Sequence, residues 1–132
     1  MKHKKRTIVA LLAAVLVLAL ALAALVWQNL PRRITATDAA FDLSQLTDGR
    51  YVGSCDNGPV KVVVAVDVQN HAITGVEILK HDNGRGRAAN AITADVVRRQ
   101  SVEVDTVAGA TYSSDTILKA VETALSKGQV EE

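Results

Sequence analysis

The sequence has little cysteine, proline or aromatic content, with one cysteine, two prolines and four aromatic residues in 132. A single cysteine, Cys55, excludes an intrachain disulfide and a metal cluster held by several cysteines. We interpret Cys55 as a small residue of the domain rather than a redox thiol. No catalytic triad is recognisable, and Gly84-Arg85-Gly86 is too short for a nucleotide-binding loop. These absences argue against a stand-alone enzyme that converts a small metabolite.

Positive charge is scarce in the second part of the chain. From Ile34 onward, nine lysines and arginines stand against 14 acidic residues, a net charge of −5. Nucleic acids bind to basic surfaces, because their phosphates are negatively charged. We therefore expect no nucleic-acid partner.

The N-terminal part is a long apolar run between basic residues. No charged residue occurs over 7–31, and the 20 residues of 8–27 are enough to cross a hydrocarbon core of roughly 30 Å. A cleaved signal peptide is the alternative, although its apolar core would normally have only about 7–15 residues. More basic residues precede the run than follow it, which predicts a cytoplasmic N-terminus, a single pass through the cell membrane and an extracytoplasmic C-terminal domain.

Three regions are predicted along the chain. Residues 1–33 form a membrane anchor with basic flanks, 34–47 form a tether, and 48–132 form the folded domain. Strands are predicted over 49–55, 60–68 and 73–79. The second carries valines on one face, and the bend at 69–71 joins it to the third in a hairpin.

Two helices are expected to cover this sheet. Residues 88–100 and 115–127 both repeat apolar side chains at helical spacing, and Gly128 can end the second helix. A short strand over 101–104 is predicted between them. The expected fold is α+β: a small antiparallel sheet with a valine-rich hairpin packed with two helices, preceded by one N-terminal transmembrane helix.

The stretch with the most chemical character is 105–114, Asp-Thr-Val-Ala-Gly-Ala-Thr-Tyr-Ser-Ser. Gly109 has no side chain to obstruct the approach of another molecule to the hydroxyl of Thr111. A helix beginning near Ser113 or Ser114, with one of these serines as its cap, would direct N–H groups at an anion such as phosphate. Taken alone, the same motif also fits an ordinary loop that enters a helix.

Three stretches together resemble the FMN-binding domain family. They are Asp-Gly-Arg-Tyr-Val-Gly at 48–53, the valine-rich hairpin, and Gln-Ser-Val-Glu-Val-Asp at 100–105 followed by Val-Ala-Gly-Ala-Thr-Tyr-Ser-Ser at 107–114. The resemblance spans about 48–125. The family includes the peripheral flavoprotein subunits of the Rnf complex and of the sodium-pumping NADH:quinone reductase. Its most specific motif is Asp-x-x-(Ser/Thr)-Gly-Ala-Thr, with Ala108 standing here where the family usually has a hydroxyl residue.

The resemblance implies how the cofactor is held. The last threonine of the motif takes FMN through a phosphoester bond that a separate flavin transferase makes from FAD, and this threonine corresponds to Thr111. Asp105 would order the loop or be recognised by the transferase, and the serines would bind the phosphate. Tyr112 and Tyr51 could pack on the isoalloxazine, and His81 could line its edge, bind a metal or belong to a solvated turn. The candidate cofactor-binding residues are therefore Thr111, Asp105, Ala108, Gly109, Ala110, Tyr112, Ser113, Ser114, Tyr51 and His81.

The function that the resemblance implies is a membrane-anchored extracytoplasmic electron carrier with covalent FMN. Its expected partners are the membrane, the flavin transferase, and membrane or extracytoplasmic redox proteins or a quinone. Two alternatives stay open. One is a flavin-dependent reductase with a specific small acceptor, which needs a substrate-sized cavity beside the flavin. The other is a non-redox binding or sensing module in which Thr111 is never modified.

Overall fold

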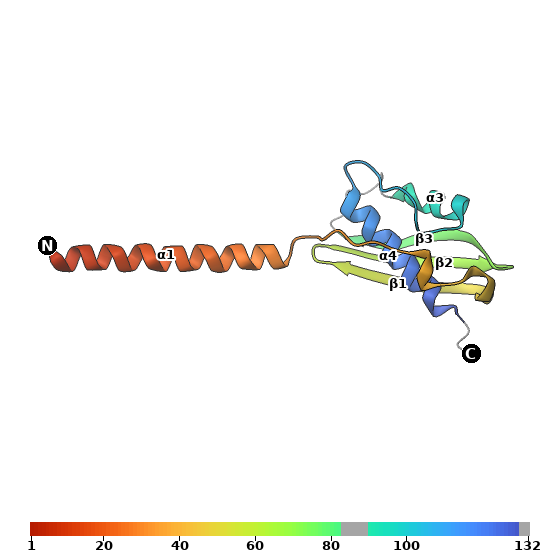
Figure 1. The fold of residues 1–132 in the computed structure, drawn as a ribbon, viewed down its shortest axis with the longest axis horizontal. Coiled ribbons are helices and arrows are strands. Elements are labelled where there is room, and N and C mark those ends of the chain that lie inside the picture. Colours follow the sequence, from red (N-terminus) through yellow and green to blue (C-terminus); the bar gives the residue numbers. More distant parts are fainter. Residues whose placement is uncertain (83–89, 130–132) are drawn as a thin grey trace. The chain divides into compact units, whose positions relative to one another are not determined.

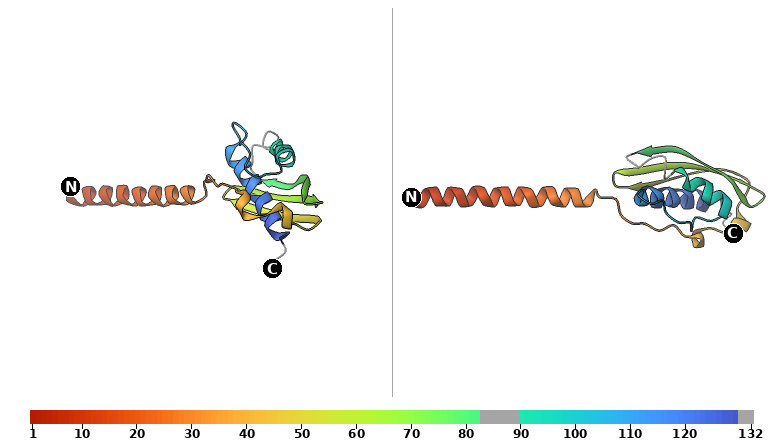
Figure 2. Two further views of the ribbon diagram at one scale, coloured as in Figure 1. Left: turned by 45° about the vertical axis from the view of Figure 1, so that its right-hand side comes forward. Right: turned by 90° about the horizontal axis from the view of Figure 1, so that it is seen from above.

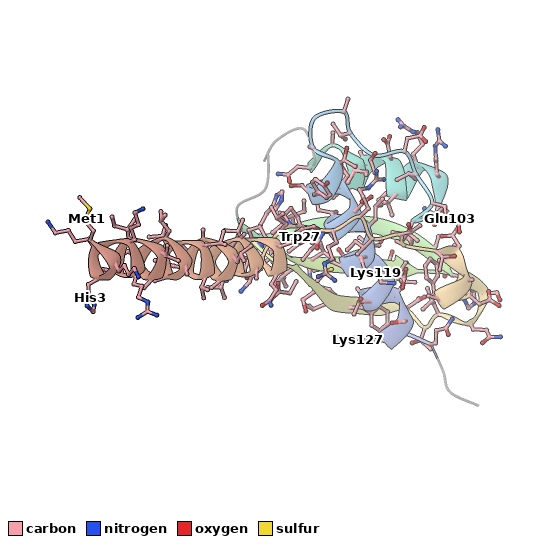
Figure 3. All side chains as sticks on the ribbon, turned by 60° about the vertical axis from the view of Figure 1, so that its left-hand side comes forward. Met1, His3, Trp27, Glu103, Lys119 and Lys127 are labelled. Carbon is pink, nitrogen blue, oxygen red and sulfur yellow. The ribbon has the colours of Figure 1, made fainter. Side chains whose placement is uncertain are left out.

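The computed structural model describes residues 1–82 and 90–129 (Figure 1). The chain forms two units, Met1–Leu30 and Pro31–Glu132. The first unit is the single helix α1, Lys2–Gln28, which buries none of its residues. Met1 and His3 lie at one end of this helix and Trp27 lies at the other (Figure 3). Its 27 residues are long and apolar enough to cross a membrane, as predicted.

The second unit is built on a three-stranded antiparallel sheet in the order β1-β2-β3. Its strands are β1 (Gly49–Asn57), β2 (Val60–Gln69) and β3 (Ala72–Asp82). The β2–β3 turn has positive φ angles at both Asn70 and His71, the geometry of a tight hairpin whose twist matches its strands. The predicted strands and hairpin are confirmed, each strand being longer than predicted.

The core lies between one face of this sheet and the helices. Alternate valines of β2 are buried on that face: Val60, Val62, Val64, Val66 and Val68. Helix α4, Thr111–Lys127, packs against β1 and β2, and helix α3, Ile92–Arg99, packs against β3 (Figure 2). A Cβ atom on Gly53 would overlap the backbone of Ala120 and Ala124, so helix and strand approach closely there. The α+β fold class is thereby confirmed.

The connection between the two helices differs from the prediction. Residues 88 and 89 of the first predicted helix lie outside the described residues, and α3 begins at Ile92. The short strand predicted over 101–104 is wrong, because this segment has no regular structure. The N–H of Val102 donates to Asp38 Oδ1 at 2.9 Å instead of to a neighbouring strand. The apolar pattern that suggested a strand reflects the burial of Val102.

The predicted tether is part of the folded unit. Residues 34–47 include two short 3₁₀ helices, η1 (Asp38–Ala40) and η2 (Leu43–Gln45). Ala36, Phe41 and Leu46 are buried in the core, and burial of these apolar side chains holds the segment against the domain. We call residues 31–46 the N-terminal strap. The folded unit therefore begins at Pro31 rather than at residue 48.

Candidate functional site

The site predicted from the sequence lies where the loop 101–110 enters α4. The helix begins at Thr111, earlier than predicted, and Ala110 is its N-cap residue without a side-chain cap. The expected serine cap is therefore wrong. Instead, the Ser114 hydroxyl donates to the carbonyl of Ala110 at 2.7 Å and accepts from the N–H of Val107 at 3.1 Å. These bonds fasten the loop to the first turn of the helix.

Three hydroxyl groups in this first turn have different surroundings. Ser113 is 4% exposed and Ser114 is fully buried, and the binding of a phosphate by these serines stays a prediction. Thr111 is half-buried, and its hydroxyl makes no hydrogen bond within the described part of the chain. Of the three, Thr111 is the hydroxyl available to a reagent.

A cavity of about 200 Å³ opens beside Thr111. Its walls come from the strap, the β1–β2 turn, the loop and the start of α4, through Pro31, Pro59, Val60, Gly109, Ala110, Thr111, Tyr112 and Ser113. Gly109 has a φ of 78° and open space where a side chain would project, which leaves the hydroxyl approachable. The structure thus brings five of the predicted site residues together at one cavity.

Other predicted residues are near the cavity or far from it. Asp105 and Ala108 are exposed on the same loop without lining the cavity. Tyr51 lies at the opposite end of α4: an added Cβ on Gly128 would lie 2.7 Å from its ring, and its hydroxyl donates to the Thr47 carbonyl. The 17 residues of α4 separate these ends by roughly 25 Å. The structure does not bring Tyr51 to Thr111, because β1 places this ring beside the helix C-terminus.

His81 lies at the same end of the sheet as the cavity. It pairs with Val62 across β2 and β3, and paired residues share a face of the sheet, so its ring lies on the inner face. Val60, two residues from Val62, lines the cavity. The His81 Nε2 atom is buried and has no hydrogen-bond partner among the described residues. A buried polar atom without a partner at this end of the sheet fits a ligand-binding role.

One pair beside the site was missed from the sequence. Arg33 Nε donates to Asp115 Oδ2 at 2.7 Å, and Asp115 follows Thr111 by one helical turn. Arg33 was interpreted only as a flank of the membrane segment. The signal that could have indicated the pair was an acidic residue among the apolar positions of the helix.

Cys55 lies elsewhere, and burial raises the pKa of its thiol, which suits an unreactive residue.

The fold and the site together define a small α+β binding domain with an accessible hydroxyl at the start of its central helix. The chain belongs to the FMN-binding domain family, whose model matches residues 57–126. The protein is therefore a flavin-binding protein, with FMN as its flavin. The matched segment contains β2, β3, α3 and most of α4, including Thr111, whereas the strap lies outside it. No curated protein matches the sequence.

Proposed function

We propose that this protein is a membrane-anchored electron-transfer flavoprotein that carries FMN covalently, through a phosphoester on Thr111. Membership of the FMN-binding domain family supports FMN as the cofactor. The observation that carries the point of attachment is the contrast in the first turn of α4, where the Thr111 hydroxyl is accessible and those of Ser113 and Ser114 are buried. Attachment to Ser114 would break the bonds of its hydroxyl to Val107 and Ala110.

The attachment reaction uses FAD as donor and a separate flavin transferase as catalyst. The Thr111 oxygen forms a bond to the phosphorus of the FMN half, the pyrophosphate bond breaks, AMP leaves, and the hydroxyl proton passes to the transferase or to water. The N-terminus of α4 favours the resulting negative charge, because the first N–H groups of a helix carry partial positive charge. The open space at Gly109 admits the transferase.

The alanine at position 108 is compatible with this reaction. Its side chain is exposed, so a methyl group in place of the usual hydroxyl leaves the packing of the domain unchanged. The departure from the family pattern therefore concerns recognition by the transferase. The nucleophile itself is present at Thr111.

The membrane anchor holds the electron carrier at the membrane. Basic residues precede α1, which favours a cytoplasmic N-terminus and an extracytoplasmic domain. A covalent bond keeps the flavin on the protein where released FMN would be lost by diffusion. FMN supplies one- and two-electron chemistry, and the chain supplies attachment, orientation and exclusion of water. The electron donors and acceptors are membrane or extracytoplasmic redox proteins, or a quinone.

The test is the intact mass of the full-length chain after co-expression with a flavin transferase. We expect an added mass of FMN less one water, located by peptide mapping on Thr111, and flavin fluorescence that survives denaturation. Thr111→Ala should lose both signals, whereas Thr106→Ala, a hydroxyl removed from the same loop, should keep them. An unmodified wild type beside a second substrate that the same transferase modifies would contradict covalent attachment. Bound flavin that is released on denaturation would then favour non-covalent FMN.

A further inference from the structure

The N-terminal strap follows the helix that carries Thr111. Pro31 lines the cavity beside Thr111, Arg33 bonds to Asp115, and the N–H of Thr37 donates to Glu122 Oε2 at 2.8 Å. Positions 111, 115 and 122 lie on one face of α4, because side chains four and seven residues apart stack along a helix. The strap thus adds residues from outside the matched segment to the surroundings of the attachment site.

The two partners of the ion pair between Arg33 and Asp115 differ in their exposure to solvent. The Asp115 side chain is 6% exposed and the Arg33 side chain is 65% exposed. A buried carboxylate needs a partner, which explains the contact from the Nε atom of Arg33. Arginine often binds a carboxylate with two parallel N–H groups, but here Nε makes the hydrogen bond alone. Within the described part of the chain, both Nη groups of Arg33 have no acceptor.

The carboxylate that holds Arg33 lies one helical turn from the proposed attachment residue. Thr111 and Asp115 are four residues apart in α4, and such pairs have Cβ atoms roughly 5–6 Å from each other. A phosphate on the Thr111 oxygen and the Asp115 carboxylate are then two neighbouring anions. A guanidinium that already contacts one of them can donate its remaining N–H groups to the other.

We propose that Arg33 binds the phosphate of the FMN on Thr111, bridging it to Asp115. This inference rests on the proposed function. Asp115 acts as a positioning residue, since it fixes the guanidinium that meets the phosphate. The chain segment that leaves the membrane helix thereby becomes part of the cofactor site, although the family's matched segment begins only at residue 57.

Arg32 separates this role from a general effect of basic residues beside the membrane. Its backbone N–H donates to Asn57 Oδ1 at 2.8 Å, and its carbonyl accepts from Asn57 Nδ2 at 2.7 Å. This reciprocal pair fixes the strap immediately before Arg33. The residue itself is exposed, and its side chain makes no hydrogen bond or ion pair within the described residues. Arg32→Gln is therefore a matched control with the same change of charge.

The experiment compares full-length wild type, Arg33→Gln, Arg33→Lys and Arg32→Gln in detergent. Each is made with and without a flavin transferase, and the gain in Tm on modification is measured within each variant. Any structural effect of the substitution is then removed from the comparison. We expect Arg33→Gln to lose roughly 4–8 °C of the wild-type gain, the size expected when one net hydrogen bond is lost from such a domain. Arg33→Lys should keep part of the gain and Arg32→Gln all of it.

The fraction modified at limiting transferase is the second readout. A lower fraction in Arg33→Gln than in Arg32→Gln, with partial recovery in Arg33→Lys, would support the proposal even if too little modified Arg33→Gln is obtained for melting. An equal gain and an equal fraction in wild type and Arg33→Gln would overturn it, as would an equal loss in Arg32→Gln. An unmodified wild type would overturn the proposed function as well, so the two failures are distinguishable.

Discussion

The two ends of α4 differ in how closely the rest of the chain packs against them. At its N-terminus, Gly109 has open space around it and Thr111 offers a hydroxyl without a hydrogen bond to the described residues. At its C-terminus, Gly128 lies against the ring of Tyr51 and the side chain of Leu46, and its carbonyl accepts from the N–H of Thr47. Glycine occurs at both ends for different reasons: access at one and close packing at the other.

This difference shows which part of α4 contributes most to the stability of the domain. The middle and C-terminal parts of α4 bury most of its apolar residues, among them Ile117, Val121 and Leu125. The first turn is held by a buried serine hydroxyl, Ser114, rather than by a cap. We therefore expect substitutions to cost less stability the closer they lie to the accessible end.

The largest effect is expected at Gly53, where β1 meets the helix. A methyl group there would overlap the Ala120 carbonyl oxygen and the Ala124 nitrogen, which are backbone atoms and cannot rotate away. Gly53→Ala should destabilise the domain by about 3 kcal/mol or more, because the helix must move away from the sheet. Thermal unfolding of the chain in detergent, followed by circular dichroism, measures this. A melting temperature equal to wild type would show that the helix is not fixed at this contact.

A smaller loss is expected at Gly128. A Cβ atom there would lie 2.7 Å from the Tyr51 ring and 2.9 Å from a Leu46 methyl group, which are side chains that can shift. Gly128→Ala should cost about 1–2 kcal/mol, within the usual range for overpacking. Because the strain comes from the ring, the double variant with Tyr51→Leu should recover part of it. Losses that simply add in the double variant would place the strain elsewhere.

Gly109→Ala makes the same substitution of alanine for glycine at the N-terminal end of α4. Alanine meets no atom there, but it must adopt a φ of 78°, which costs about 1–2 kcal/mol for a residue with a Cβ. A second variant, Gly109→Asn, should lose less stability than Gly109→Ala, because asparagine tolerates this conformation better. Equal losses in the two variants would show that the loop does not keep this φ in solution.

The sheet could be predicted from local sequence because its signals are local. Valines alternating over β2 and the short turns on either side define strands without reference to distant residues. The segment around Val102 shows the limit of this reasoning. Its pattern resembled a strand, but its N–H is bonded to Asp38, which lies 64 positions earlier in the chain.

Within the site, the sequence motif indicated Thr111 as the proposed attachment residue, but it did not indicate which residues surround it. Thr111 could be identified from a short pattern, whereas the positions of Tyr51 and Arg33 depend on how β1 and the strap lie along α4. The same holds for the serines. Their hydroxyls suited a cap in the sequence, but burial of both and the bonds of Ser114 within the turn leave the N-cap to Ala110.

Thr111→Ala should have the smallest effect on stability and the most complete effect on the cofactor. The hydroxyl bonds to no described residue, so its loss should change the free energy of unfolding of the unmodified domain by at most about 0.5 kcal/mol. Ser114→Ala is the contrasting variant, because it removes the buried hydroxyl that closes the loop and should cost about 1–3 kcal/mol. Thermal unfolding of both, measured without transferase, compares them directly. A Thr111→Ala loss as large as that of Ser114→Ala would mean that Thr111 supports the fold, and the open end of α4 would then be structural like the closed one.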